Sequence, residues 1–376
     1  MKNFKLKHYI NYIVIAIATL VLGIVGASGA LPSSTLYMLE KIAIAIILAV
    51  SLNIVVGLLG ELSLGHAGFM CVGAYIGGKV AELLDHGGDN IGVLLLSVVI
   101  GGLVAALFGF IIGLPALRLR GDYLAIVTLA FGEIVRTIFM NTSKETFGGT
   151  LGLATPRYDK NYLFIIAFIL VLGCLAVTQN MMRSKHGRAI TSIRDSEIAS
   201  RATGINVTKY KLIAFTVSAF FAGVAGVLYS ASNFRVTSSV FDYNYSIEIL
   251  VMVVLGGMGS INGSIISATL ITFLNLQLST VLTGDLAVLK NLIYAVILIL
   301  IVIYNNAPAL KFFREKYNLK NLLDFIFKKK EVDASQQNDD AARWDVVPTK
   351  IDMNEVLSVD LQVKESVSDP DKGVDE

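Results

Sequence analysis

Five ionisable residues of this 376-residue chain stand within or at the ends of its long apolar stretches: Glu61, Asp122, Glu133, Arg136 and Glu248. Charge inside a membrane is costly to bury and often marks an ion or proton path. Glu133 and Arg136 are three residues apart, so they share a helix face and can neutralise each other. Glu61 and Asp122 fall at predicted span ends, where water reaches them, and Glu248 begins a span. An ion-relay role and a structural role therefore both stay open.

The segment 60–78, GELSLGHAGFMCVGAYIGG, is rich in glycine over a span-like length. Because glycine disfavours helix by about 1 kcal/mol relative to alanine, packing or a ligand must compensate. Small residues such as Gly73 and Gly77 would let helices approach closely. Alternatively, the segment is broken or re-entrant, and its backbone faces a polar cavity. The substrate-path candidates are then Ser63, Gly65, His66 and Gly68. His66 has a second interpretation, a hydrogen bond to a neighbouring helix.

The sequence lacks the motifs that would hydrolyse ATP or hold a metal. It contains no G-x-x-x-x-G-K-[ST], no H-E-x-x-H, no G-x-S-x-G and no cluster of Cys and His. Its two cysteines, Cys71 and Cys174, lie in apolar runs, which excludes a disulfide scaffold. We therefore expect no catalytic residue, no metal site and no cofactor on this chain. Either a partner drives it or it couples to an ion gradient.

Membrane-spanning helices must position these residues. The chain is 55% hydrophobic and 16% charged, with a mean hydropathy of +0.68, whereas soluble domains are about 45–50% apolar and about 25% charged. Stretches without Asp, Glu, Lys or Arg cover 8–39, 42–60, 62–78, 90–117, 161–182, 212–234, 249–284 and 291–310. A crossing needs about 20 apolar residues. Dividing the 249–284 stretch at 256–263 and adding 121–140, we predict an all-α, polytopic protein with about ten transmembrane helices, including 62–80 and 244–258.

The distribution of Lys and Arg predicts the orientation. With the N-terminus inside, the inside loops hold 19 of these residues and the outside loops hold six. Such an excess is typical of cytoplasmic loops, so we expect both termini in the cytoplasm and an even number of spans. An alternative is that the N-terminal apolar run is a secretory signal cleaved near 26–30. Cleavage would leave the later orientation unchanged.

We predict that 1–310 forms the transmembrane domain, with one large cytoplasmic loop at 181–211. In this loop Ala189, Ile193 and the pair 198–199 recur at helical spacing, which predicts a short amphipathic helix. Gly204 is expected to end it. Its solvated residues are Arg188, Arg194, Asp195, Glu197 and Arg201. An exposed charged helix suits contact with a soluble partner; the alternative is a solvated loop.

The C-terminal region differs in charge from the rest. Residues 311–330 carry +5 and have apolar residues at helical spacing, which is typical of a helix lying on anionic lipid. Packing on a partner subunit is the alternative. Residues 331–376 hold 13 Asp and Glu but 4 Lys and Arg, a net −9 that leaves +11 on 1–330. This acidic segment is predicted to be a disordered cytoplasmic tail.

Five runs occur in a fixed order along the chain. They are GELSLGHAGF at 60–69; LRLRGDY at 117–123, followed by TLAFGE at 128–133; GRAI at 187–190 with IRD at 193–195; GINV at 204–207, followed by YKL at 210–212; and a final run from Glu248 to LGGMGS at 255–260. Together they resemble the permease subunits of branched-chain amino acid ABC importers over roughly 40–305. The LRLRG run and the long loop resemble the larger of the two paralogous permeases.

The resemblance implies a function and a set of partners. The chain would form the translocation path for leucine, isoleucine, valine or a similar small polar solute in a bacterial cell membrane. Its partners would be a second permease, two ABC ATPase subunits holding ATP and Mg²⁺, an extracytoplasmic solute-binding protein and membrane lipid, with no nucleic acid. Loop 188–206 would be the segment that couples to the ATPase. Departures are Glu197, one place early for the usual coupling pattern, a missing Leu-Pro, and Ser264 and Ser267 after Gly263. An ion-coupled secondary transporter or channel without an ATPase is the alternative.

Overall fold

The computed structural model of the chain describes residues 32–85, 87, 90–119, 121–281, 295–296 and 299. The chain divides into two units, Met1–Asn306 and Ala307–Glu376, and all described residues belong to the first. The predicted first helix and its cleavage site, the interfacial helix at 311–330 and the acidic tail lie outside the described residues. So does all but three residues of the predicted span at 291–310.

The described part of the chain is almost entirely helical. Its elements, in chain order, are α2 (Ser33–Asn53) with a π-helix (Ile54–Leu59), α3 (His66–Leu84), α4 (Ile91–Ala116), α5 (Asp122–Met140), α6 (Lys144–Phe147), a 3-10 turn (Gly149–Leu151), β1 (Leu153–Ala154), α7 (Lys160–Arg183), α8 (Lys185–Asp195), α9 (Glu197–Ala202), α10 (Val207–Asn233), β2 (Arg235–Val236), a 3-10 turn (Ser238–Val240), α11 (Tyr243–Gly256) and α12 (Ile261–Val281). Seven helices among these residues are long and apolar enough to cross a membrane. The chain is therefore a multi-pass membrane protein.

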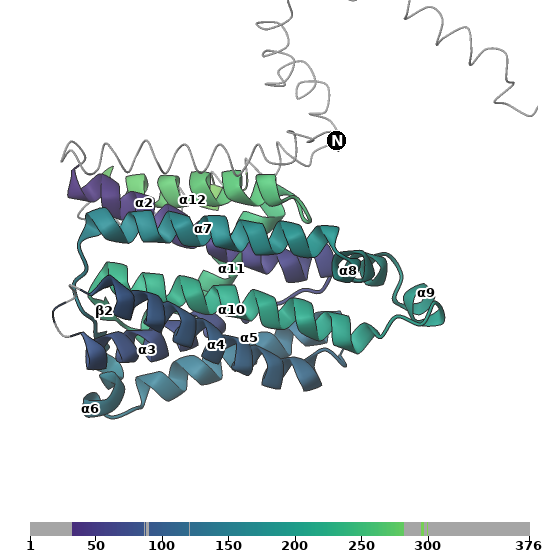
Figure 1. The fold of residues 1–376 in the computed structure, drawn as a ribbon, viewed down its shortest axis with the longest axis horizontal. Coiled ribbons are helices and arrows are strands. Elements are labelled where there is room, and N and C mark those ends of the chain that lie inside the picture. Colours follow the sequence, from purple (N-terminus) through teal and green to yellow (C-terminus); the bar gives the residue numbers. More distant parts are fainter. Residues whose placement is uncertain are drawn as a thin grey trace, which may run out of the picture. The chain divides into compact units, whose positions relative to one another are not determined.

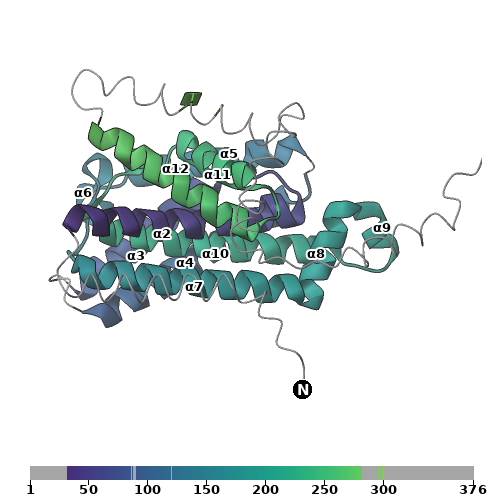
Figure 2. The same ribbon diagram turned by 90° about the horizontal axis from the view of Figure 1, so that it is seen from above.

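The spanning helices run side by side (Figures 1 and 2). Helix α10 packs on α3 and α4, while α2 packs on α7, α10 and α12. The α8–α9 loop lies at one end of the bundle, and α6 and β2 lie at the other (Figure 1). There β1 and β2 form a short antiparallel ribbon in which Leu153 pairs with Val236.

Apolar side chains outside the core identify the surface that lipid or another subunit must cover. On α4, Leu94 and Val98 are buried, whereas Leu103, Leu107 and Ile111 are more than half exposed. Glycines allow the inner contacts: a Cβ on Gly73 of α3 would lie 2.5 Å from the Cα of Gly223 in α10. Small residues thus bring these two helices into backbone contact.

Two breaks interrupt the helices. The π-helix ends at Gly60, whose φ of +81° favours glycine, and 60–65 is not helical before α3 begins at His66. The glycine-rich segment therefore contains a break and also packs closely through Gly73. The second break follows α11, which has 14 residues and rises only about 21 Å. The prediction that 244–258 crosses the membrane is thus not confirmed.

The loop at 181–211 contains two helices where one was predicted. Ser196 adopts an extended conformation (φ −161°, ψ 109°) between α8 and α9, and its Oγ accepts a hydrogen bond from the Ala199 amide at 3.3 Å. Serine competes for backbone hydrogen bonds in this way and favours helix caps. As a result Ile198, predicted to lie on the apolar face with Ala189 and Ile193, is 79% exposed, while those two are buried.

Candidate functional site

The break at 60–65 is held by two helices from distant parts of the chain. The Leu64 amide donates a hydrogen bond to Thr128 Oγ1 of α5 at 3.0 Å. The Ala67 amide donates to Ser246 Oγ of α11 at 3.2 Å. Amides in the first turn of a helix have no partner within it, so Ser246 satisfies one amide at the N-terminus of α3, while Thr128 holds the segment that precedes it. The start of α3 thus lies between α5 and α11.

The cavity at this junction is closed: its empty space of about 150 Å³ includes open solvent and leaves no room for a water molecule. Its lining residues come from the start of α3, from α5 and from the segment entering α11: Leu64, Ala67, Gly68, Leu129, Gly132, Glu133, Phe241, Asp242, Tyr243 and Ser246. Two carboxylates, a serine hydroxyl and a tyrosine stand beside glycine backbone here. Once the helices separate, acidic groups next to a helix N-terminus are suited to a small molecule that carries both charges.

The four predicted substrate-path residues have different places. Gly68 lines the cavity. Gly65 packs against α5 so closely that a Cβ would lie 2.5 Å from the carbonyl oxygen of Thr128. Ser63 is buried and is not among the lining residues. The buried His66 faces α2, where its Nε2 is hydrogen-bonded to Ser51 Oγ at 2.8 Å. This contact agrees with the alternative that His66 forms a hydrogen bond to a neighbouring helix. A direct role for Ser63 and His66 in the path stays a prediction.

The three intramembrane charges have partners. Arg136 Nη2 lies 2.8 Å from Glu133 Oε2, and about 30% of each side chain is exposed. The mutual neutralisation expected from their spacing is thereby confirmed. Glu248 Oε1 accepts a hydrogen bond from Asn275 Nδ2 at 3.0 Å, which joins α11 to α12. Among the described residues, no cluster of His, Cys, Asp and Glu could hold a metal ion.

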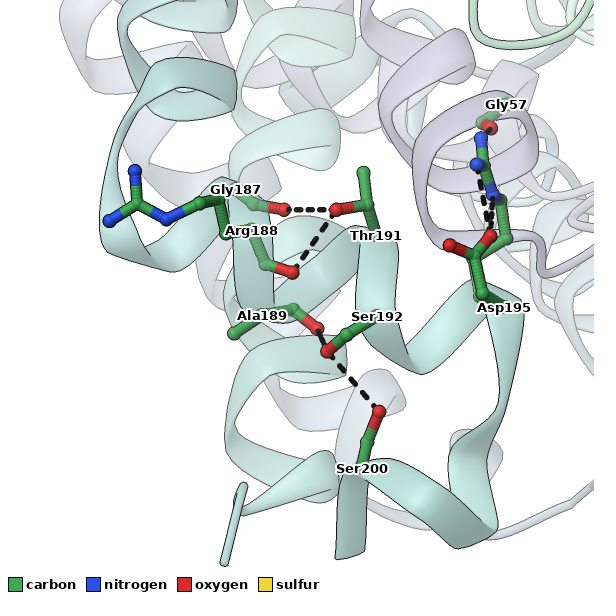
Figure 3. Close-up of polar contacts among 9 residues, drawn as sticks. Gly57, Gly187, Arg188, Ala189, Thr191, Ser192, Asp195 and Ser200 are labelled. Carbon is green, nitrogen blue, oxygen red and sulfur yellow. Dashed lines mark hydrogen bonds and ion pairs between the residues drawn. The ribbon is translucent and has the colours of Figure 1, made fainter. Parts of the chain in front are cut away.

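The two breaks and the end of α8 meet around Gly57. Asn53 Oδ1 accepts a hydrogen bond from the Gly259 amide at 2.9 Å, which connects α2 to the turn between α11 and α12. The Gly57 carbonyl accepts one from Arg194 Nη1 at 3.3 Å; Figure 3 shows Gly57 beside Asp195, which also pairs with Arg194 at 3.0 Å. A Cβ on Gly57 would collide with the Asn53 side chain and the Gly259 amide. Only glycine allows this meeting of three elements.

The rest of the loop presents a surface to the outside of the bundle. Arg188 is exposed and points away from the other side chains drawn in Figure 3. Ser200 Oγ donates to Ser192 Oγ at 3.2 Å and ties α9 to α8. As predicted, Gly204 (φ +85°) follows the last helical turn, and the Ile205 amide bonds back to the Ser200 carbonyl at 3.0 Å. The exposed residues include Arg201 and Ile198.

The sequence did not predict one cluster of charged residues. The ammonium group of Lys211, in α10, contacts the carboxylates of Glu61 and Glu197. Glu61 was predicted to reach water at a span end, yet its side chain is only 15% exposed. Glu61 and Lys211 carry opposite charges at two span ends on the same predicted side of the membrane, and this pattern could have indicated the ion pair. Their separation of 150 residues hid the contact.

Comparison with known proteins gives relatives that are transport permeases. The branched-chain amino acid transport system permease component family matches residues 34–302. LivM, a permease protein of the high-affinity branched-chain amino acid transport system of Escherichia coli K12, is 37% identical over 310 residues, covering 74% of this chain and 70% of that protein.

More distant relatives belong to similar systems. LivH, a second permease protein of high-affinity branched-chain amino acid transport in the same organism, is 23% identical and covers 60% of this chain and 78% of its own. The E. coli ribose import permease protein RbsC is 24% identical over 72% of this chain and 84% of its own. No solved structure matches the chain.

Proposed function

The chain belongs to the branched-chain amino acid transport permease family and is a permease subunit of an ABC importer, and on this premise we propose how its parts serve uptake. The solute is leucine, isoleucine, valine or a similar small zwitterion. LivM, at 37% identity, is named for branched-chain amino acid transport, whereas RbsC, named for ribose, is 24% identical. ATP and Mg²⁺ bind to two partner ATPases, and an extracytoplasmic protein delivers the solute. The chain itself supplies the path and holds neither a metal nor a catalytic group.

The α8–α9 end of the bundle is cytoplasmic in this proposal, and so are both termini, in a bacterial inner membrane. The excess of Lys and Arg at this end supports that orientation. The exposed Arg188, Ile198 and Arg201 then face a groove of the ATPase. An exposed isoleucine between basic residues suits such a protein interface better than it suits water.

A second permease covers the cavity face of α5. Glu133 and Arg136 lie in the second half of the 19-residue α5, and each side chain is about 30% exposed. Charged side chains at such depth face a protein interior or a water-filled path, because contact with hydrocarbon costs several kcal/mol. The cavity between α3, α5 and α11 is closed in this structure, and its opening is then the part of the path that this subunit contributes.

The meeting of both breaks with α8 at Gly57 is the observation that carries the proposal. A site that binds the ATPase must act on the solute path through an element with two arrangements. Arg194 contacts the π-helix (Ile54–Leu59) that precedes the break at 60–65. Movement of α8 and α9 with the ATPase therefore acts directly on the segment that starts α3.

The test is ATP-driven leucine uptake into vesicles containing this chain, the second permease, the ATPases and the binding protein. Replacing Gly204 by Asp, or reversing both Arg194 and Arg201 to Glu, is expected to abolish uptake while membrane insertion continues. Gly204 is exposed, so Gly204→Asp adds a negative charge to the surface that carries Arg188 and Arg201. Lys144→Glu, an exposed reversal at the other end of the bundle, serves as the control and keeps uptake near the wild-type rate. Undiminished uptake in both loop variants would contradict the assignment of the α8–α9 loop.

A further inference from the structure

Three elements meet at one buried ammonium group. The side chain of Lys211, in the second turn of α10, is 3% exposed. It contacts the Glu61 carboxylate and lies 3.1 Å from Glu197 Oε2. Glu61 belongs to the break at 60–65, and Glu197 is the first residue of α9. Glu197 Oε1 also accepts from Arg201 at 2.5 Å. We call Glu61, Lys211 and Glu197 the lysine triad.

Because Lys211 is buried, its ammonium group requires close anionic partners. An ammonium group taken out of water loses several kcal/mol of hydration, which only close anionic partners restore. Removing one partner of such a group is far more costly than breaking an exposed pair. Lys211 therefore must keep at least one carboxylate contact. When α9 moves and carries Glu197 with it, the fraction of the Lys211 charge that Glu61 must neutralise changes.

Glu61 stands where the chain can respond. It follows Gly60, whose positive φ ends the π-helix, and its amide donates to the Val55 carbonyl at 3.1 Å. π-helical turns often occur at functional sites and rearrange locally. Leu64 lies three residues after Glu61 and lines the cavity, and its amide donates a hydrogen bond to Thr128 of α5. A displacement of the Glu61 carboxylate thus affects the start of α3 through a short, non-helical connection.

We propose that Lys211 is a positioning residue for transport: through Glu197 and Glu61 it transmits movement of α9 to the 60–65 segment that starts α3. The proposal rests on the function proposed above, in which α9 moves with the ATPase. Arg194 contributes a second contact at Gly57, but its side chain is 40% exposed. The lysine triad is the more shielded connection between the loop and the break.

The experiment uses the complete importer in vesicles and measures leucine uptake and ATP hydrolysis in the same preparation. Lys211→Met keeps the length and apolar stem of the side chain but removes its charge. We expect uptake to fall at least tenfold while hydrolysis stays within twofold of the wild-type rate and the ATPase still co-purifies. Lys209→Met, an exposed lysine two residues earlier on α10, is the matched control and retains uptake within twofold.

Exchanging the charges of Glu61 and Lys211 distinguishes a role of Lys211 in transmission from a role in folding. Glu61→Lys combined with Lys211→Glu restores an opposite pair between the break and α10, and we expect uptake at least threefold above that of either single variant. Lys211→Met with near-wild-type uptake would overturn the proposal. So would uptake and hydrolysis falling in parallel with no recovery in the exchange variant, since a purely structural lysine would behave in that way. If the wild-type importer itself takes up no branched-chain amino acid, the proposed function fails, independently of Lys211.

Discussion

The contact between Gly68 of α3 and Gly132 of α5 gives a sharp test of the packing beside the cavity. A Cβ built on Gly68 would lie 2.7 Å from the Cα of Gly132 and 3.3 Å from Cε1 of Phe131. A Cβ built on Gly132 meets Gly68 only at 3.7 and 3.8 Å, which are ordinary contact distances. The two glycines face each other, yet only one of them has no room for a methyl group.

The expected cost follows from these distances. Because carbon atoms pack best at about 3.5–4.0 Å, Gly68→Ala forces α3 and α5 apart by about 1 Å. Overpacking of this kind costs about 1–3 kcal/mol of unfolding free energy. Both substitutions gain about 1 kcal/mol of helix propensity, so this gain cancels in their comparison. Gly68→Ala should be less stable than Gly132→Ala by about 1–3 kcal/mol.

Thermal unfolding of the purified chain in detergent measures this difference. At roughly 2–4 °C per kcal/mol, the Tm of Gly68→Ala should lie roughly 2–12 °C below that of Gly132→Ala. Gly173→Ala is a further control, since nothing lies within 4 Å of a Cβ at that exposed site on α7. Equal Tm values for Gly68→Ala and Gly132→Ala would refute the backbone contact between α3 and α5.

Two further predictions concern polar side chains of the helices. Glu133→Gln keeps an oxygen that accepts a hydrogen bond from Arg136, so ATP-driven uptake should stay within about threefold of wild type; uptake that collapses with the proton gradient would instead favour ion coupling through Glu133. Ser51→Ala leaves the buried Nε2 of His66 without its partner and should cost about 1–3 kcal/mol of unfolding free energy. Thermal unfolding checks the second, with the exposed Ser239→Ala expected to be neutral.

The helices could be predicted because their signal is local. The charge-free stretch 161–182 became α7 (Lys160–Arg183), and 42–60 ended within one residue of the π-helix. The helix end at Gly204 also follows from the conformational freedom of a single glycine. The close approach at Gly73 follows from its missing side chain, although its partner Gly223 is distant in the chain.

The missed features depend on contacts between distant residues or on competition within one turn. A charged residue at a span end is expected to reach water, and nothing near Glu61 in sequence reveals the lysine 150 residues away. The β1–β2 ribbon has two residues in each strand, too few for a periodic pattern. At Ser196 both a continuous helix and a cap are compatible with the sequence. Tertiary contacts such as that between Ser192 and Ser200 favour the cap.

The position of the π-helix explains why coupling should act on 54–65 rather than on α10. Helix α10 has 27 residues with a regular hydrogen-bond ladder, and packed helices of this kind move as rigid bodies. The π-helix Ile54–Leu59 instead ends at a carbonyl-rich C-terminus, where a cation such as Arg194 is favourably placed. Lys211 holds the next residues through Glu61. Arg194 and Lys211 therefore both contact the segment 54–65. Its π-helical backbone can rearrange locally, and transmission between two sites requires an element with two arrangements.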